Sequence, residues 1–188
     1  MSDLGYQSKE QDNLMICYNS LNSYVKTLRE VLVKPNPSYE LIGLKDALGK
    51  YKQLNVNVLQ IENEFYSPIR PKRSADPGET PLQALSKKGV EYIEVRCLDL
   101  NPFLPLGIDR EQIDFMDVFL MTCLLSKSAP TDQEEHYRIL KNQKIMVYQG
   151  RSPNLMLHDK YKSRTFRDWG HSIFEKMYPV AALFDQQK

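Results

Sequence analysis

Apolar residues recur at helical spacing in several stretches of the chain. The clearest case is residues 21–32, where they occupy every third or fourth position, a pattern typical of a helix with one buried face. Asn19 or Ser20 is a suitable N-cap for this helix. Pro35 and Pro37 end it, because proline cannot continue the backbone hydrogen bonding of a helix.

Helical patterns return further along the chain. The stretch PLQALSK starts with a proline behind Thr80, which favours a short helix with threonine as its N-cap. Asp109 and Gln112 make a capping-box-like start for another helix, behind which an apolar stripe follows. Two more helical segments are predicted, at about residues 131–148 and 163–187.

Three other stretches predict strands. Residues 13–18 form a short apolar run, whereas residues 55–66 and 90–103 alternate in polarity, so that successive side chains point to opposite faces. Between the last two lies SPIRPKRSADPGETP, residues 67–81, which we expect to be a loop because it is rich in proline and glycine. The mixture of elements predicts an α+β fold.

Charged side chains share single faces of the two alternating stretches. Glu62 lies beside Glu64 on one predicted strand, and Glu94 beside Arg96 on the other. Carboxylates that face a common cavity could bind Mg²⁺, and an arginine there could hold a carboxylate or a phosphate. An antiparallel sheet with one solvated face gives the same alternation, so the pattern alone leaves both interpretations open.

A second charged feature is the basic cluster of the predicted loop, which contains Arg70, Lys72 and Arg73. It could neutralise the phosphates of a nucleotide, although a solvated turn explains the same residues. Neither a GxxxxGK[ST] nor a GxGxxG sequence occurs, so the usual glycine-rich phosphate loops are absent from the sequence.

Composition narrows the function further. The 188 residues include 25 basic and 24 acidic ones, a balance that argues against nonspecific binding of nucleic acid. The three cysteines are odd in number and far apart, which favours a reducing compartment and therefore the cytoplasm. No apolar run approaches the ~18 residues of a membrane-spanning helix.

Several long motifs, in order along the chain, closely resemble glutamate–cysteine ligase of the proteobacterial type. They are MSDLGY, VLQIENEFYSPIRPKR, GVEYIEVRCLDLNPF and PLGID. The resemblance implies ATP-dependent ligation of the γ-carboxylate of L-glutamate to L-cysteine through a γ-glutamyl phosphate, the first step of glutathione biosynthesis, with Mg²⁺ required. It also implies a glutamine-synthetase-like catalytic domain, in which an antiparallel sheet has helices packed behind it.

The resemblance assigns roles to four residues of this sequence. Glu94 matches a position associated with metal binding, and its neighbour Arg96 matches the arginine that stabilises charge on the transferring phosphoryl group. Tyr6 and Tyr66 match tyrosines of the pocket for the cysteine substrate, where a phenol could donate a hydrogen bond to the substrate carboxylate.

Four further residues are candidates on weaker grounds. The resemblance suggests that Arg70 and Lys72 approach the nucleotide. Glu62 and Glu64 are metal candidates only because they share a face of the predicted strand, and we expect at most one of them to contact metal.

The resemblance covers only part of the family's length. It implies that the chain is a partial catalytic domain, lacking the N-terminal half and the extreme C-terminus, with a sheet-rich active-site part at 1–108 and a helical part at 109–188. We therefore expect the isolated chain to be inactive and to require a complementary N-terminal chain. The alternatives are an inactive remnant and a non-catalytic anion-binding α+β module.

Overall fold

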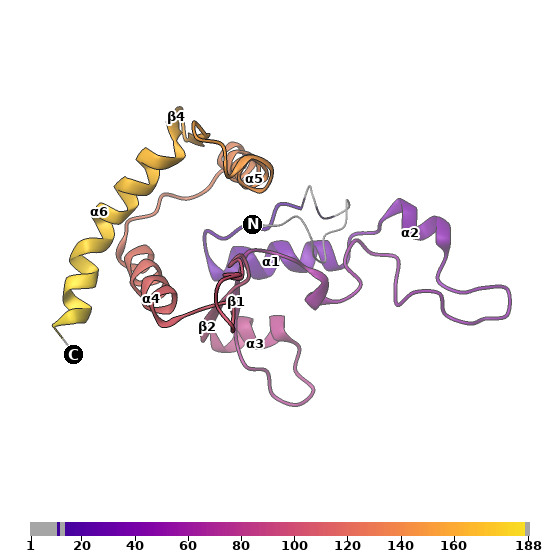
Figure 1. Ribbon diagram of the computed structural model, residues 1–188. Helices are drawn as coiled ribbons and strands as arrows, with labels where there is room; N and C mark the ends of the chain where they lie inside the picture. Colours follow the sequence, from indigo (N-terminus) through magenta and orange to yellow (C-terminus); the bar gives the residue numbers. More distant parts are fainter. Residues whose placement is uncertain (1–10, 12–13, 187–188) are drawn as a thin grey trace. The chain divides into compact units, whose positions relative to one another are not determined.

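The computed structural model describes residue 11 and residues 14–186 of the chain (Figure 1). The described residues divide into two compact units, those up to residue 97 and those from residue 98 onward. Both units combine α-helices with a short antiparallel ribbon, so the fold class is α+β, as the sequence predicted.

Two amphipathic helices frame the first unit, and both were predicted. Helix α1 spans Leu21–Leu32, and Ser20 and Ser23 form a capping box at its start. Helix α3 spans Pro81–Lys88, with Thr80 as its N-cap. The two helices pack against each other, because each has its apolar stripe on the side that faces the other.

A core of apolar side chains lies between these helices and the segment that joins them. Leu28 of α1 and Leu59 of the joining segment are its most completely buried large side chains. The buried members of this cluster are Ile16, Tyr24, Val25, Leu28, Val31, Leu59, Phe65, Leu82 and Leu85. The core therefore gives the first unit a packed base of its own.

The first unit also contains a two-stranded antiparallel ribbon. Strand β1 spans Ile69–Lys72 and strand β2 spans Tyr92–Val95. The prediction of a loop throughout 67–81 was therefore wrong for residues 69–72, which form β1. Pro71 lies inside β1, which is tolerated because a two-stranded ribbon consists only of edge strands. The predicted strand at 90–103 was right but too long.

The predicted strand at 55–66 does not form. Polar side chains bond the local backbone instead: Asn57 N donates to Asn55 Oδ1 at 2.8 Å, and Gln60 N donates to Glu64 Oε2 at 2.6 Å. Such bonds compete with strand pairing. The segment turns through a short 3₁₀ helix, η1 (Glu62–Glu64), and residues 14–18 likewise belong to no strand.

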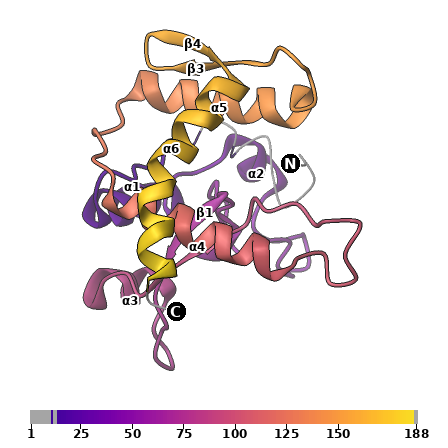
Figure 2. The same ribbon diagram turned by 60° about the vertical axis from the view of Figure 1, so that its left-hand side comes forward.

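The described part of the second unit consists of helices and a hairpin, labelled α4, α5, α6, β3 and β4 in Figure 2. The helices are α4 (Arg110–Leu125), α5 (Gln133–Gln149) and α6 (Phe166–Asp185). All three were predicted, and Asp109 caps α4 as expected. The hairpin of β3 (Met156–Asp159) and β4 (Lys162–Thr165) was not predicted, and it delays the start of the last helix.

Within this unit, α4 packs against α6, and α5 packs against β3. Pro179 lies inside α6, where it removes one backbone hydrogen bond. None of the helices in the described part of the chain is long and apolar enough to span a membrane.

Candidate functional site

The ribbon of β1 and β2 brings together the charged residues that the sequence analysis singled out. In its register Arg70 lies directly opposite Glu94, and Lys72 lies opposite Tyr92. Residues opposite each other in an antiparallel pair project to the same face, as do residues two apart in one strand. Arg70, Lys72 and Glu94 therefore share one face, which we call the charged face. Arg96 follows β2, and its backbone N–H donates to Pro68 O at 2.8 Å.

Glu94 is the only carboxylate among the four residues Arg70, Lys72, Glu94 and Arg96, and it is surrounded by cations. Its Oε2 lies 3.0 Å from Arg96 Nε and 3.9 Å from Lys72 Nζ, and its Oε1 accepts a hydrogen bond from Arg96 at 3.2 Å. This bond from Arg96, together with the charges of Arg96, Lys72 and Arg70, lowers the pKa of Glu94, although partial burial opposes the shift. Glu94 is therefore ionised, and these residues keep an excess of positive charge.

Arg70 is buried beside the apolar core of the first unit. Its side chain is only 5 % exposed, and its Nε is buried without a hydrogen-bond partner among the described residues. It lies close to Tyr24 of α1. Burial, reinforced by the neighbouring Tyr18, raises the pKa of Tyr24 to about 12, while Arg70 opposes the rise through its charge and a hydrogen bond. The Tyr24 phenol is thus neutral and can partner the guanidinium.

A small pocket lies beside Arg70, lined also by Glu62, Lys72 and Arg73 and by apolar residues of α1 and α3. Its volume is about 20 Å³, which is room for about one water molecule. The pocket is thus too small for a nucleotide, and a ligand of that size would have to meet the ribbon from outside it.

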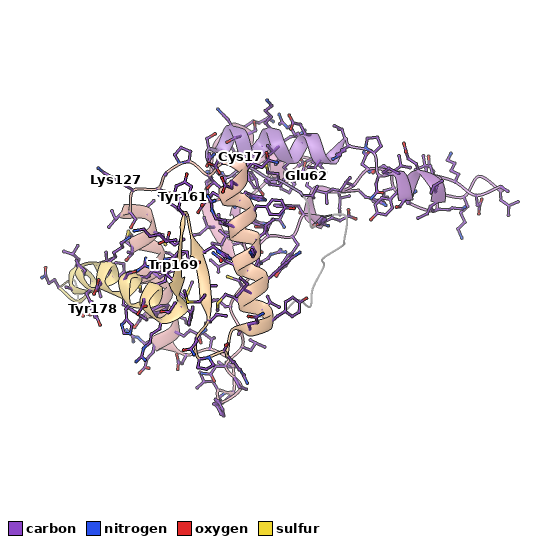
Figure 3. The ribbon with its side chains drawn as sticks, turned by 90° about the horizontal axis from the view of Figure 1, so that it is seen from above. Cys17, Glu62, Lys127, Tyr161, Trp169 and Tyr178 are labelled. Atoms are coloured by element: carbon purple, nitrogen blue, oxygen red, sulfur yellow. The ribbon has the colours of Figure 1, made fainter. Side chains whose placement is uncertain are left out.

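Glu62 and Glu64 have structural partners in this unit. Glu62, labelled beside α1 in Figure 3, accepts the backbone N–H of Leu82 in the first turn of α3 at 2.8 Å. A carboxylate there satisfies a backbone donor that has no partner within the helix. Glu64 accepts Gln60 N. Because no strand forms, the shared-face argument that made both residues metal candidates fails.

Only one of the two tyrosines predicted for substrate binding lies among the described residues. Tyr66 lies just after Phe65, the C-cap of η1, and is half-buried. Its backbone N–H donates to Gln11 Oε1 at 3.2 Å. Tyr6 lies outside the described residues. The roles of both tyrosines remain predictions.

Sequence reasoning missed Tyr18. Its hydroxyl donates to Ile69 O at 3.0 Å and lies 2.8 Å from Ser67 Oγ, so it fixes the start of β1. Polar and apolar residues alternate in both IRPK (69–72) and YIEV (92–95). This alternation could have indicated that the two segments pair as strands, with Arg70 opposite Glu94. Tyr18 gives no such signal, because its partners are about fifty residues away along the chain.

The described residues provide only part of a donor set for a metal ion. Within the described ranges, no three His, Cys, Asp or Glu side chains come close enough to hold a metal. Glu94 fits one ligand position, because a carboxylate oxygen is the donor that Mg²⁺ prefers and its Oε2 is buried without a well-aligned hydrogen bond.

Comparison with known proteins agrees with the fold and the motifs. The family model for glutamate–cysteine ligase matches residues 1–146. The chain is similar to the glutamate–cysteine ligases of Saccharophagus degradans (50% identity over 98% of this chain) and Alcanivorax borkumensis (47% over 99%). It also matches the crystal structure of the Francisella tularensis glutamate–cysteine ligase in complex with AMP, with a TM-score of 0.86, 39% identity, and coverage of 95% of this chain and 36% of that one. The chain therefore belongs to the glutamate–cysteine ligase family.

The matched region is a minor part of those relatives. The chain spans 35% and 36% of the length of the two curated relatives named above.

Proposed function

We propose that this chain forms part of an ATP-dependent ligase that joins the γ-carboxylate of L-glutamate to L-cysteine through a γ-glutamyl phosphate. The observation that carries the proposal is the charged face of Arg70, Lys72 and Glu94 together with the neighbouring Arg96, whose guanidinium forms an ion pair with the Glu94 carboxylate. Membership of the family supports this reaction and its place in glutathione biosynthesis.

Arg96 is the residue to which we assign the catalytic role. In phosphoryl transfer a protein mainly positions the reactants and stabilises charge that develops on the transferring group. The Glu94 carboxylate binds the guanidinium of Arg96, and the backbone bond to Pro68 fixes the main chain of Arg96, so the side chain is oriented before a substrate arrives. A preorganised cation of this kind favours the charged transition state.

Lys72 and Arg70 would act on the nucleotide. Lys72 is partly exposed and can approach a phosphate directly, whereas Arg70 is buried and contributes mainly by its charge and by holding its place opposite Glu94. The binding of AMP by the Francisella tularensis relative supports use of a nucleotide. Tyr66 and Tyr6 would bind the carboxylate of the cysteine substrate.

Glu94 would supply one ligand to Mg²⁺, with the remaining ligands from outside the described residues. When bound, the ion would neutralise negative charge on the phosphates. Glu94 thus has two tasks in the proposal: it orients Arg96, and it offers a carboxylate oxygen on the side of the incoming nucleotide. Glu62 and Glu64 are weaker candidates, because each already accepts a backbone hydrogen bond.

We further propose that activity requires the rest of the family enzyme, supplied by a complementary N-terminal chain, and that the isolated chain is inactive. The chain spans only 35% and 36% of the length of two curated relatives, which supports this dependence. We place the enzyme in the cytoplasm, because Cys17, Cys97 and Cys123 are all free thiols, as expected in a reducing compartment.

The test inserts this chain in place of the matching segment of the Saccharophagus degradans relative. We expect the resulting chimera, but not the isolated chain, to form γ-glutamylcysteine from ATP, Mg²⁺, glutamate and cysteine. Arg96→Ala in the chimera should lower kcat at least about 100-fold, as loss of a preorganised charge-stabilising donor does. Arg29→Ala, an exposed arginine in the last turn of α1, is the control and should leave kcat unchanged. Turnover by the isolated chain, or a near-normal rate for Arg96→Ala, would contradict the proposal.

A further inference from the structure

Residues 37–54, which we call the arm, form an extension of the first unit (Figure 1). The arm consists of helix α2 (Pro37–Ile42) and the loop after it. Every one of its residues is described, and none is buried. Leu48 at its tip is 94% exposed and Leu41 on α2 is 90% exposed. The other exposed large apolar side chains of the arm are Ile42, Leu44, Tyr51 and Leu54.

The tip of the arm is nevertheless well ordered by local hydrogen bonds. Asp46 Oδ1 accepts the backbone N–H groups of Leu48 and Lys50, each at 2.9 Å. Gly49 has a φ of +81°, a conformation that favours glycine, and its N–H donates to Asp46 O. Lys45 pairs with Tyr51 across the loop, with its Nζ 4.4 Å from the centre of the tyrosine ring.

The base of the arm is fixed in the same way. Asn36 is buried, accepts Ser38 N with its side chain at 2.9 Å, and donates its own N–H to Val56 O. The side chain of Gln53 donates to the backbone oxygens of Tyr39 and Gly43 at 2.7 and 3.1 Å. Polar groups therefore hold the backbone, while the apolar side chains contribute nothing to a core.

A preorganised loop that exposes large apolar side chains is typical of an interaction surface. The chain is also only 35% of the length of the relative that it matches at 50% identity, so most of a family enzyme lies outside it. We propose that the arm docks on the part of the ligase outside this chain. Because the arm carries three lysines (Lys45, Lys50 and Lys52) and two acidic residues (Glu40 and Asp46), the receiving surface should be apolar with a slight excess of acidic groups at its rim. This inference rests on the proposed function.

The experiment measures accessibility of the tip in the isolated chain and in the chimera described above. Leu48→Cys is labelled with a maleimide, and the labelled peptides are resolved by mass spectrometry, so that the native cysteines do not interfere. We expect the thiol introduced by Leu48→Cys to react at least about tenfold more slowly in the chimera, because docking shields it. Lys26→Cys, on the exposed face of α1, should react at similar rates in both proteins.

A second variant tests the energetic consequence of docking. Leu48→Asp should lower the Tm of the chimera and leave the Tm of the isolated chain unchanged, because Leu48 is 94% exposed in the latter. Lys26→Asp is the matched control and should change neither Tm.

The other outcomes identify other occupants. Slow labelling in the isolated chain that speeds up on dilution would show that a second copy covers the arm, and slow labelling independent of dilution would show that residues 98–188 cover it. Either result, or fast labelling in an active chimera, would overturn the docking proposal and leave the ligase function intact. Protection in an inactive chimera would support docking and count against the function.

Discussion

The two units of the chain are stabilised in different ways. The first packs the apolar faces of α1 and α3 and the joining segment into one cluster, whose centre includes Leu28 and Leu59. Among the described residues of the second, only Leu155, Leu157, Met177 and Val180 are buried apolar side chains. The unit that positions the charged face therefore has its own core, and the second unit depends more on local polar contacts.

Contacts of the second unit show this dependence. Phe115 of α4 and Phe174 of α6 meet with ring centroids 5.9 Å apart, yet both remain exposed. By contrast, the Asn142 amide bonds His158 with both of its ends, since Asn142 Nδ2 donates to His158 O at 2.7 Å and His158 N donates to Asn142 Oδ1 at 2.8 Å. This amide therefore links α5 to β3 by two hydrogen bonds, whereas α1 and α3 are joined by apolar packing.

The largest effect is expected from emptying the core of the first unit. Leu59→Ala should lower the free energy of unfolding by about 2–5 kcal/mol, because Leu59 is 0% exposed and its removal leaves a cavity. Urea unfolding should be followed by circular dichroism and by the fluorescence of Trp169, the only tryptophan, which lies in the second unit. We expect the part of the circular dichroism change that comes from α1 and α3 to move to lower urea concentration, and the Trp169 transition, which reports the second unit, to change little.

The control for this substitution is Leu54→Ala, the same change at an exposed site five residues earlier, which should cost less than about 0.5 kcal/mol. Equal shifts of both signals in Leu59→Ala would show that the two units unfold together, and the contrast between them would then not extend to their stability.

A smaller effect is expected from the polar link of the second unit. Asn142→Ala should cost about 1–3 kcal/mol, because it leaves the N–H and C=O of His158 without their partner. Asn142→Asp keeps the acceptor for His158 N but turns a carboxylate oxygen toward His158 O, so it should also be destabilising. The urea-induced change in Trp169 fluorescence measures the cost of each of the two substitutions. An Ala variant as stable as the parent would show that water replaces the amide without loss.

Sequence patterns were sufficient where local capping and apolar spacing agree. Helices α1, α3 and α4 begin at side-chain caps that can be read directly, Ser20, Thr80 and Asp109. The alternation of residues 90–103 also predicted that Glu94 and Arg96 share a face, and the two side chains form an ion pair. These features depend on residues only a few positions apart.

The failures have a common physical cause, which is that the deciding partners are distant or polar. Residues 55–66 alternate like a strand, but their amides and carboxylates bond the backbone nearby. Pro71 indicated a loop, yet pairing with β2 makes a strand. The position of Arg70 opposite Glu94 follows from that pairing, so the charged face could only be predicted in part.

The smallest expected effect concerns the ion pairs at α3 in the first unit. Glu79 Oε2 lies 2.8 Å from Lys88 Nζ, and Lys88 also contacts Asp76 at 2.7 Å. The hydrogen bond from Lys88, assisted by the backbone N–H of Asp76, lowers the pKa of Glu79 from 4.5 to about 2. A depressed carboxyl pKa stabilises the folded state above the unfolded value, and this contribution is lost as the pH falls toward about 2.

We therefore expect the parent chain to lose stability between pH 4.5 and about 2 more steeply than Glu79→Gln, which has no carboxyl to titrate there. Thermal unfolding at a series of pH values measures the difference, and Glu30→Gln on the exposed face of α1 is the control. The difference should shrink in about 1 M NaCl, because salt at that concentration screens charges beyond about 3 Å. If the pH profiles of the parent and Glu79→Gln coincide at low salt, the Glu79–Lys88 pair adds nothing to the stability of the first unit, and the core alone accounts for it.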